Sequence, residues 1–450
     1  MENAEAALQL LSSDNNYWRS KVGVILGDAR LFSGNPKDAY HYYLDVHHNN
    51  QSYGNTYLMI STGFKVATTL HYMGRLEEAQ ILTRDLLQTA KNCGLDKQPR
   101  AGLLWTLFGD LLREKGNLEE AERCVERGLL LSEPEKPAHG WNYLYRISLH
   151  VSQQDYNLAL ETIKELENLH LEVALPNFII IPLTAWKILV MLALNKLPEA
   201  RAIIDEAEIS TTDQIPGGWE RTYLALAQVE IEEILGSYKQ VKNLLQQIKT
   251  AARKGNSRQL LLEALLTESY LEERENNSEL AEKLLNVALA AANESGYFQT
   301  FLDQSRSLIS VYKRVLANKN ELATDRSDQA NIDLAQRIYS DLNNEPDKSS
   351  PEIQTAEAKD LPPKEAPSVE PQTKPNHEEP AHDALIEELS ARETEILTLL
   401  SQGLSNQQIA QQLFLSPGTV KWHASNIYGK LGVRGRLQAV ALARKLKLLS

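Results

Sequence analysis

The sequence predicts an all-α protein in three parts: a helical solenoid, an extended linker and a small four-helix domain. Three observations support this prediction. A pattern recurs about every 40 residues through residues 1–340, prolines crowd residues 341–384, and short capped helices fill residues 385–450. With 450 residues the chain is too long for one compact core and suits two or three folding units.

Each copy of the repeat has a small anchor residue and, five positions earlier, a residue that can end a helix. The anchors are Ala39, Ala79, Ala121, Ala159, Ala200, Val241 and Ala281, which lie 38 to 42 residues apart. The residues five positions earlier are Gly34, Gly74, Gly116, Gln154, Asn195, Gly236 and Asn276. Gly and Asn best tolerate the left-handed conformation that ends a helix, and a small anchor lets the next helix pack closely. This period, with two helices per copy, is typical of an α-solenoid.

The pattern resembles tetratricopeptide repeats, with helices longer than those of the usual unit of about 34 residues. The resemblance implies a curved array whose concave face suits an effector. Aromatic residues in the first helices of the repeats are the candidate effector-binding residues: Trp105, Trp141, Tyr143 and Trp219. Aromatic residues at such positions are more often rungs of a packed interior, and this alternative stays open.

Residues 341–384 form the predicted linker. They contain eight of the 17 prolines of the chain and no aromatic residue. Such a segment cannot bury enough apolar surface to offset the entropy of ordering it, and its prolines favour extended conformations. We therefore expect a disordered tether between a repeat domain at 1–340 and a terminal domain at 385–450.

The net charge of −13 is unevenly distributed. Residues 385–450 contain eight Lys or Arg and four Glu, a net charge of +4, so the preceding 384 residues carry −17. An acidic body with a basic end domain predicts that only the end domain meets a polyanion. A merely solubilising basic end is the alternative.

Composition predicts a soluble, cytoplasmic protein that needs no cofactor or metal. Two cysteines cannot build a disulfide framework, and the first 15 residues lack the basic cluster of a secretory signal. The apolar stretch 174–194 is interrupted by two prolines, an asparagine and a lysine, which favours a buried helix pair over a bilayer span. His41, His47 and His48 lack the spacing of a metal site, so we expect them on the surface.

The terminal domain contains four predicted helices. The first begins with a capping box formed by Ser390 and Glu393 and ends at Gly403. The second begins with the same spacing at Ser405 and Gln408. The third and fourth are expected at residues 417–431 and 438–448, and the third starts with a proline, which fits the first helical position.

The third helix has one apolar and one polar face. At 100° per residue, the residues that face the core are Val420, Ala424, Ile427 and Leu431. The outer face and its flanks hold Gly418, Thr419, Lys421, Trp422, Ser425, Asn426 and Gly429. This face offers a cation, an indole, hydroxyls and an amide but no carboxylate, which suits the major groove of double-stranded DNA. The second and third helices therefore predict a helix-turn-helix.

The motifs LSARE at 389–393, GLSNQQIA at 403–410 and GTVKWHASNIYGKLGV at 418–433 resemble the LuxR-type DNA-binding domain. The resemblance implies that Lys421, Trp422 and Ser425 approach base edges and that Thr419, Lys421 and Lys430 approach phosphates. With Asn426 on the flank of the same face, these six residues are the candidate DNA-binding set. In such domains the last helix often forms a dimer contact, which here falls on Val440, Ala441 and Arg444.

The combination of repeats and terminal domain resembles the MalT-like group of large ATP-dependent LuxR regulators. Residues 293–303, NESGYFQTFLD, are similar to the segment that closes the sensor region in that group. Those regulators carry a nucleotide-binding domain, whereas this sequence has no Gly-x-x-x-x-Gly-Lys-Ser/Thr phosphate loop. Either that domain has been removed or this is a short form that works without it.

These observations predict a DNA-binding transcriptional regulator, activator or repressor, rather than an enzyme. The expected partners are promoter DNA, an unknown small-molecule or protein effector in the solenoid, a second copy on DNA, and RNA polymerase. Effector binding that changes solenoid self-association would raise the local concentration of paired DNA-binding domains. The alternative is a helical-repeat scaffold whose basic end domain docks on a protein partner.

Overall fold

The computed structural model describes residues 2–12, 15–52, 54–211, 214–233, 238–317, 326–343, 391–413, 436–446 and the single positions 420, 424, 427, 431, 433 and 448. The described residues form helices and connecting turns, without a strand among them, as the predicted all-α class requires. The chain divides into two compact units, Met1–Pro351 and Glu352–Ser450. Most of the predicted linker lies outside the described residues.

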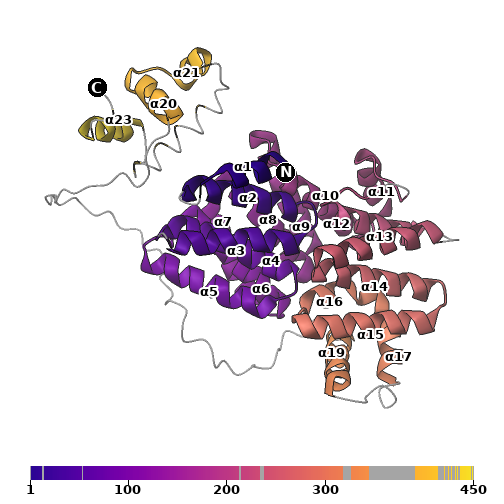
Figure 1. Ribbon diagram of the computed structural model, residues 1–450. Helices are drawn as coiled ribbons and strands as arrows, with labels where there is room; N and C mark the ends of the chain where they lie inside the picture. The colour runs from indigo at the N-terminus through magenta and orange to yellow at the C-terminus, as the bar shows by residue number, and fades with distance from the viewer. Residues whose placement is uncertain are drawn as a thin grey trace, which may run out of the picture. The chain divides into compact units, whose positions relative to one another are not determined.

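The first unit is built of helices joined by short turns (Figure 1). Its first nine helices are α1 (Glu2–Leu10), α2 (Asn16–Leu31), α3 (Pro36–Ser52), α4 (Thr56–Tyr72), α5 (Leu76–Asn92), α6 (Pro99–Glu114), α7 (Leu118–Ser132), α8 (Lys136–Ser152) and α9 (Tyr156–Val173). The following ones are α10 (Asn177–Ala193), α11 (Leu197–Glu206), α12 (Glu220–Glu233), α13 (Lys239–Gly255), α14 (Arg258–Arg274), α15 (Ser278–Ser295), α16 (Gln299–Gln304), the 3-10 turn η1 (Arg306–Leu308), α17 (Ile309–Ala317) and α19 (Arg326–Asn343).

The predicted repeat is confirmed at its two marker positions. All seven anchors are fully buried, from Ala39 to Ala281. Six of the seven residues five positions earlier have a positive φ: Gly34, Gly74, Gly116, Gln154, Asn195 and Asn276. The seventh, Gly236, lies outside the described residues. A left-handed residue therefore ends one helix and a small buried residue lets the next pack against its neighbour.

Helices α6 and α7 show how close this packing is. A Cβ added at Gly102 would lie 2.5 Å from the Gly128 carbonyl oxygen, and one added at Gly128 would lie 2.6 Å from the Gly102 oxygen. The backbones of the two helices thus approach each other closely at these glycines. Glycine is required at both positions because any larger residue would force the helices apart.

The solenoid curves until its late helices reach its early ones. Helix α13 contacts α3, α14 contacts α4, and α16 contacts both α6 and α8; Figure 1 shows α3 and α4 beside α13 and α14. The Tyr297 hydroxyl donates a hydrogen bond to the carbonyl oxygen of His71, 226 residues away in sequence. A Cβ at Gly218 would lie 2.1 Å from the Phe32 oxygen. This closure places α16 in the interior of the unit.

The apolar stretch 174–194 forms one helix, α10, so the predicted helix pair is wrong. Pro176 caps α10 at its start, where a missing N–H does no harm. Pro182 lies inside the helix, which continues because Ile179, Leu183 and Ala185 are buried in the core. Tertiary packing outweighs the lost backbone hydrogen bond here. Within the described ranges, no helix combines the length and hydrophobicity that a membrane span requires.

The second unit has its own core. Its described helices are α20 (Ala391–Ser401), α21 (Asn406–Leu413) and α23 (Arg436–Lys445). Gly403 ends α20 with a φ of 90°, and Ser405 and Gln408 form the predicted capping box: the Ser405 N–H donates to Gln408 Oε1 at 2.8 Å, and the Gln408 N–H donates to Ser405 Oγ at 3.4 Å. Ser390, the other predicted cap, lies outside the described residues. The last helix, α23, covers residues 436–445, whereas the sequence predicts residues 438–448.

Candidate functional site

The first unit contains a cavity of about 1220 Å³. Helices α4, α6, α8, α10, α12, α14 and α16 all contribute lining residues, so nearly every repeat presents one helix to it. Pockets that hold drug-sized molecules are typically about 300–1000 Å³. This cavity is therefore large enough for a small-molecule or short oligomeric ligand.

Of the four predicted effector residues, only Trp141 lines this cavity. The guanidinium of Arg127 lies over the Trp105 ring, 4.1 Å from the ring centroid. Trp219 packs against the hydrophobic core around α12. Tyr143 makes an edge contact with His139. Trp141 and Tyr143 are two positions apart on α8, about 200° around the helix, so they cannot face the same side.

An aromatic cluster forms one wall of the cavity. The rings of Phe32 and Phe178 stack with centroids 4.4 Å apart, and the Trp141 ring approaches them with centroids 6.1 Å and 5.8 Å away. Trp186 and Tyr145 also line the cavity. These rings offer flat apolar surface and π faces to whatever occupies it.

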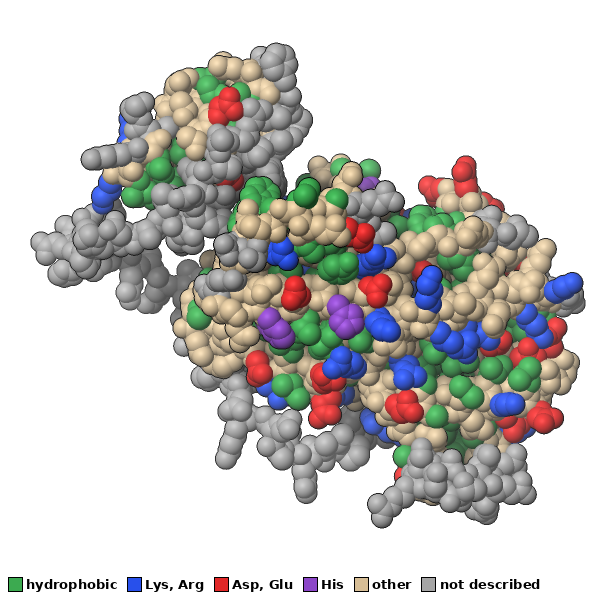
Figure 2. Space-filling view, in the orientation of Figure 1, with side chains coloured by type: hydrophobic (Ala, Val, Ile, Leu, Met, Phe, Trp, Pro, Cys, Tyr) green, Lys and Arg blue, Asp and Glu red, His purple; other side chains and the backbone are tan. Residues whose placement is uncertain are grey.

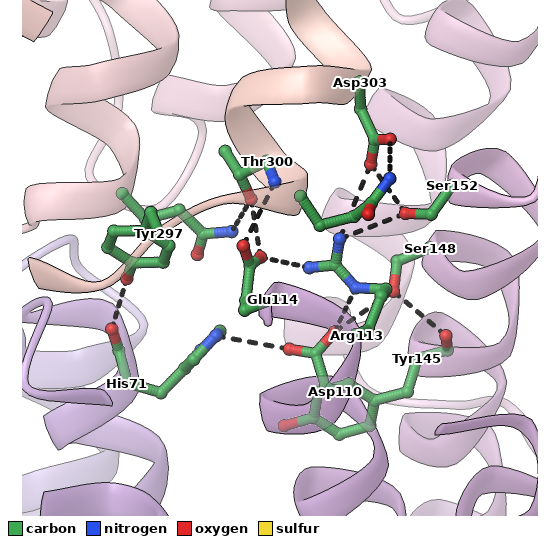
Figure 3. Close-up of polar contacts among 12 residues, drawn as sticks. His71, Asp110, Arg113, Glu114, Tyr145, Ser148, Ser152, Tyr297, Thr300 and Asp303 are labelled. Atoms are coloured by element: carbon green, nitrogen blue, oxygen red, sulfur yellow. Dashed lines mark hydrogen bonds and ion pairs between the residues drawn. The ribbon is translucent and has the colours of Figure 1, made fainter. Parts of the chain in front are cut away.

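A buried ionic network forms another part of the lining, and its centre is Arg113 on α6 (Figure 3). Arg113 Nε donates to Asp110 Oδ1 at 2.7 Å, Nη2 donates to Glu114, and Nη1 donates to Ser152 Oγ at 3.1 Å. His71 Nε2 on α4 lies 3.3 Å from Asp110 Oδ2. These four ionisable side chains are at most 5% exposed.

Helix α16 completes the network from the far end of the solenoid (Figure 3). Glu114 accepts a hydrogen bond from the Thr300 N–H at 3.1 Å and another from the Thr300 hydroxyl at 2.6 Å. Asp303 accepts bonds from the Ser152 hydroxyl at 2.6 Å and from Gln299 Nε2 at 2.7 Å, and lies 3.5 Å from Arg113 Nη1. The network therefore joins residues about 190 positions apart in sequence.

A second ion pair, between half-buried Arg221 and buried Glu263, lines the same cavity. Arg221 on α12 donates to both oxygens of Glu263 on α14, at 2.8 Å and 3.2 Å. This two-bond geometry is the strong form of an arginine–carboxylate contact.

Burial and neighbouring charges set the protonation of these groups. Burial lowers the pKa of His71, so its imidazole is neutral near pH 7. Burial opposes ionisation of Asp110, but Arg113 holds the pKa of Asp110 below its ordinary value. Burial raises the pKa of Asp303 to about 6 and raises that of Glu263 as well, although an arginine contacts each carboxylate. The cavity lining thus contains carboxylates that ionise reluctantly.

The three histidines singled out in the sequence do not behave alike. His41 and His48 are exposed as expected. His47 is buried, contrary to that expectation, and its Nδ1 lies 3.0 Å from the Met59 carbonyl oxygen. It packs inside the α3–α4 hairpin. Across the described ranges, no group of three His, Cys, Asp or Glu side chains could hold a metal ion.

All six predicted DNA-binding residues lie outside the described residues: Thr419, Lys421, Trp422, Ser425, Asn426 and Lys430. The four residues predicted to face the core are described and buried, at 0% to 6% exposure: Val420, Ala424, Ile427 and Leu431. On the predicted dimer helix, Val440 is half-buried while Ala441 and Arg444 are exposed.

The ionic network was missed at the level of sequence. Asp110, Arg113 and Glu114 follow a mostly apolar run in α6, and charged residues on a buried helix face are the signal that the sequence offers. Residues 293–303 were singled out only through resemblance. In the structure this segment supplies Thr300 and Asp303 to the network and buries Tyr297 and Phe301.

Comparison with known families assigns both parts of the chain. Residues 1–318 match the family described as the MalT-like TPR region. The chain belongs to the MalT-like TPR family. Residues 387–443 match the bacterial regulatory proteins of the luxR family. The chain thus combines a MalT-like helical region with a LuxR-type domain.

Known relatives agree with this assignment. The HTH-type transcriptional regulator MalT of Vibrio parahaemolyticus is 25% identical over 354 residues, 77% of this chain and 35% of the relative. MalT of Klebsiella pneumoniae is 24% identical over 387 residues, 84% of this chain and 40% of the relative. The probable transcriptional regulatory protein SgaR of Hyphomicrobium methylovorum is 52% identical over 61 residues, 14% of this chain and 28% of that protein.

The chain spans about a third of the length of the MalT proteins that it matches. These relatives are named as regulators and not as enzymes. A Rap protein complexed with competence and sporulation factor aligns with a TM-score of 0.31 and 15% identity, covering 71% of this chain and 79% of that one, which is too weak a likeness to support an inference.

Proposed function

We propose that this protein regulates transcription by binding promoter DNA through its LuxR-type domain and an effector in the cavity of its MalT-like helical region. The burial of Val420, Ala424 and Ile427 carries the DNA-binding part of the proposal. A helix with these three residues inside presents positions 421, 422 and 425 outside. That face is the one predicted to enter the major groove.

The proposed contacts divide into two kinds. Thr419, Lys421 and Lys430 approach phosphates and supply affinity that falls with salt, while Trp422, Ser425 and Lys421 approach base edges and supply sequence preference. Asn426 flanks the same face. Exposed Ala441 and Arg444 leave the last helix available for a dimer contact on DNA, with RNA polymerase as a further candidate partner.

The surface of the helical region favours placing DNA contact in the terminal domain. On the face in view in Figure 2, basic and acidic side chains of the described helices are interspersed and not gathered by sign. Several of these charges are paired, such as Arg201 with Glu230 and Arg314 with Glu273. Such a surface does not attract a polyanion strongly.

The cavity supports the effector part of the proposal. It lies where early and late helices of the solenoid converge, it combines an aromatic wall with charged groups, and its volume suits a small ligand. Because α16 bridges the early and late repeats at this point, an occupant would contact both ends of the solenoid.

Selection from a random DNA pool with the full chain tests this proposal. Enrichment of one motif is expected, and Lys421→Ala should weaken binding to all sequences and reduce the salt slope by about one. Lys91→Ala, which removes an exposed charge from α5, is the matched control and should bind as the unaltered chain does. Failure to enrich any motif at low salt would contradict DNA-binding function and favour a scaffold that docks on a protein.

A further inference from the structure

We propose that the cavity binds a small organic dication, a diamine or polyamine, through the carboxylates of its ionic network. This inference rests on the proposed effector cavity and assigns the chemical class of its ligand. It follows from the balance of charge, from one unpaired acceptor and from the aromatic wall.

The ionic network and the Arg221–Glu263 pair together hold more acid than base. Their carboxylates are those of Asp110, Glu114, Glu263 and Asp303, and their guanidinium groups are those of Arg113 and Arg221. With His71 neutral, full ionisation leaves two uncompensated negative charges. Uncompensated charge in a buried cluster is strongly unfavourable and is relieved either by protons or by a bound cation.

The excess falls on two carboxylates that face the cavity. Glu114 does not line the cavity, and its carboxylate oxygens accept hydrogen bonds from Arg113 and Thr300. Asp110 is held ionised by Arg113. Asp303 and Glu263 line the cavity, and burial raises the pKa of both, as it does that of Glu220 nearby in the lining. Because their pKa values are raised, these two carboxylates take up protons more readily than free carboxylates as the pH falls, and an ammonium group would replace those protons.

The other charged groups of the lining do not cancel this excess. Glu220 adds a further buried carboxylate, which accepts a hydrogen bond from the Gly218 N–H. Glu232 is paired with Arg274. Arg306 is an exposed cation at the edge of the lining. The tyrosines of the lining, such as Tyr72 and Tyr145, have pKa values that burial raises, so they remain neutral.

An unpaired acceptor points to the same ligand class. The Thr300 hydroxyl uses its proton on Glu114, so toward Gln259, 3.5 Å away, it can only accept. This arrangement fixes the Gln259 amide with Nε2 toward Thr300. Its Oε1 is then buried with no hydrogen-bond partner within the described structure, in a residue that is 6% exposed and lines the cavity. An N–H donor is what this oxygen lacks.

The aromatic wall suits the same ligand. Ammonium groups bind over the faces of aromatic rings, most strongly over tryptophan. Trp141, Trp186 and Phe178 line the cavity together with the acidic network. A dication can therefore place its ammonium groups near carboxylates while its methylene chain covers ring surface.

Calorimetric titration of the full chain with putrescine and spermidine tests the inference. We expect both to bind, and we expect no binding by 1,4-butanediol, which has the length of putrescine without its charge, or by succinate. Binding should release protons at pH 6, detected as a dependence of the measured heat on the ionisation enthalpy of the buffer. Because protons and ligand compete, affinity should rise as the pH rises from 5 to 7.

Two variants locate the site. Asp303→Asn keeps the shape but removes one negative charge, so putrescine affinity should fall about tenfold or more. Glu119→Gln removes a carboxylate that is 85% exposed on α7 and should leave affinity unchanged. A blocked Lys-Gly-Lys peptide distinguishes a peptide-borne source of the same charges from a free amine, and tighter binding by the peptide would assign the site to a peptide.

Absence of amine binding at millimolar concentration, equal binding of the diol, or equal loss in both variants would overturn the inference. DNA binding by the same preparation is measured separately. Intact motif selection with no amine binding would reject the ligand class alone, whereas lost motif selection with intact amine binding would reject the proposed regulator.

Discussion

The guanidinium of Arg337 lies over the ring of Phe298, 3.7 Å from its centroid. Arg337 belongs to α19, the last described helix of the first unit, and Phe298 precedes α16, which lines the cavity. The Phe298 N–H also donates to the Glu114 carbonyl oxygen at 3.2 Å. The contact thus connects the cavity lining with the helix at the end of the repeat region.

Loss of this contact should loosen α19. Arg337→Ala removes a cation–π contact of about 0.5–1 kcal/mol, so amide exchange in α19 should become roughly two- to five-fold faster. Gln336→Ala, on the same helix and exposed, is the control. Hydrogen exchange read by mass spectrometry measures both. Equal exchange in the two variants would show that the stacked contact does not hold α19.

The Thr300 hydroxyl should contribute measurably to the free energy of unfolding. Thr300→Val keeps the shape but leaves Glu114, which is fully buried, without one of its donors. Such a loss costs about 1–3 kcal/mol. Thr300→Ser retains the hydroxyl and should be closer to the unaltered chain. Urea denaturation followed by circular dichroism measures the difference, and equal midpoints for the two variants would contradict it.

The raised pKa of Asp303 predicts a specific pH dependence of stability. Its pKa is about 6 in the folded chain, above that of a free aspartate, so the folded state binds the proton more tightly. Its contribution to stability is therefore fully present below the unfolded pKa, near 4, and is lost as the pH rises through 6. Other carboxylates, such as Asp110, have the opposite trend.

Asp303→Asn isolates this contribution because asparagine does not ionise. Relative to that of the unaltered chain, the free energy of unfolding of the variant should increase by on the order of 2 kcal/mol between pH 4 and pH 7. Urea denaturation at each pH measures the gain. Glu119→Gln should follow the unaltered chain throughout. A difference between Asp303→Asn and the unaltered chain that is constant with pH would show that Asp303 ionises normally.

Glycine substitutions inside and outside the close α6–α7 contact should have different effects on stability. Gly102→Ala should destabilise the helical region by about 1–3 kcal/mol because its Cβ would meet the Gly128 carbonyl oxygen. Gly140→Ala, on α8, should be neutral or stabilising. Its Cβ would meet only side-chain methyl groups that can move, those of Leu175 at 3.0 Å and 3.2 Å and that of Ile179 at 3.5 Å, and alanine favours a helix. Thermal denaturation compares them; a stable Gly102→Ala variant would contradict this packing.

The repeat could be predicted from sequence because local backbone geometry demands particular residues. Left-handed helix ends select residues such as Gly74 and Asn195, and close helix packing selects buried anchors such as Ala79. The burial of Val420, Ala424, Ile427 and Leu431 could be predicted for the same reason. One turn of 3.6 residues determines which side chains share a face.

The cavity could not be predicted in this way. The hydrogen bond from Tyr297 to His71 depends on the curvature summed over the intervening repeats, and no local pattern encodes that sum. Trp141 and Tyr143 look equivalent in sequence, yet α8 turns only Trp141 to the cavity. His47 resembles a surface residue until the α3–α4 hairpin covers it.

The affinity of the full chain for its selected DNA motif, measured by fluorescence anisotropy across a salt series, tests the central claim most directly. We predict tight binding to the motif, weaker binding to a shuffled sequence, and a steep fall of affinity with salt. Lys421→Ala should weaken binding and flatten the salt slope by about one, while Lys91→Ala should do neither. Equal affinity for motif and shuffled DNA, or no effect of Lys421→Ala, would contradict the assignment of the LuxR-type domain as a sequence-specific DNA reader.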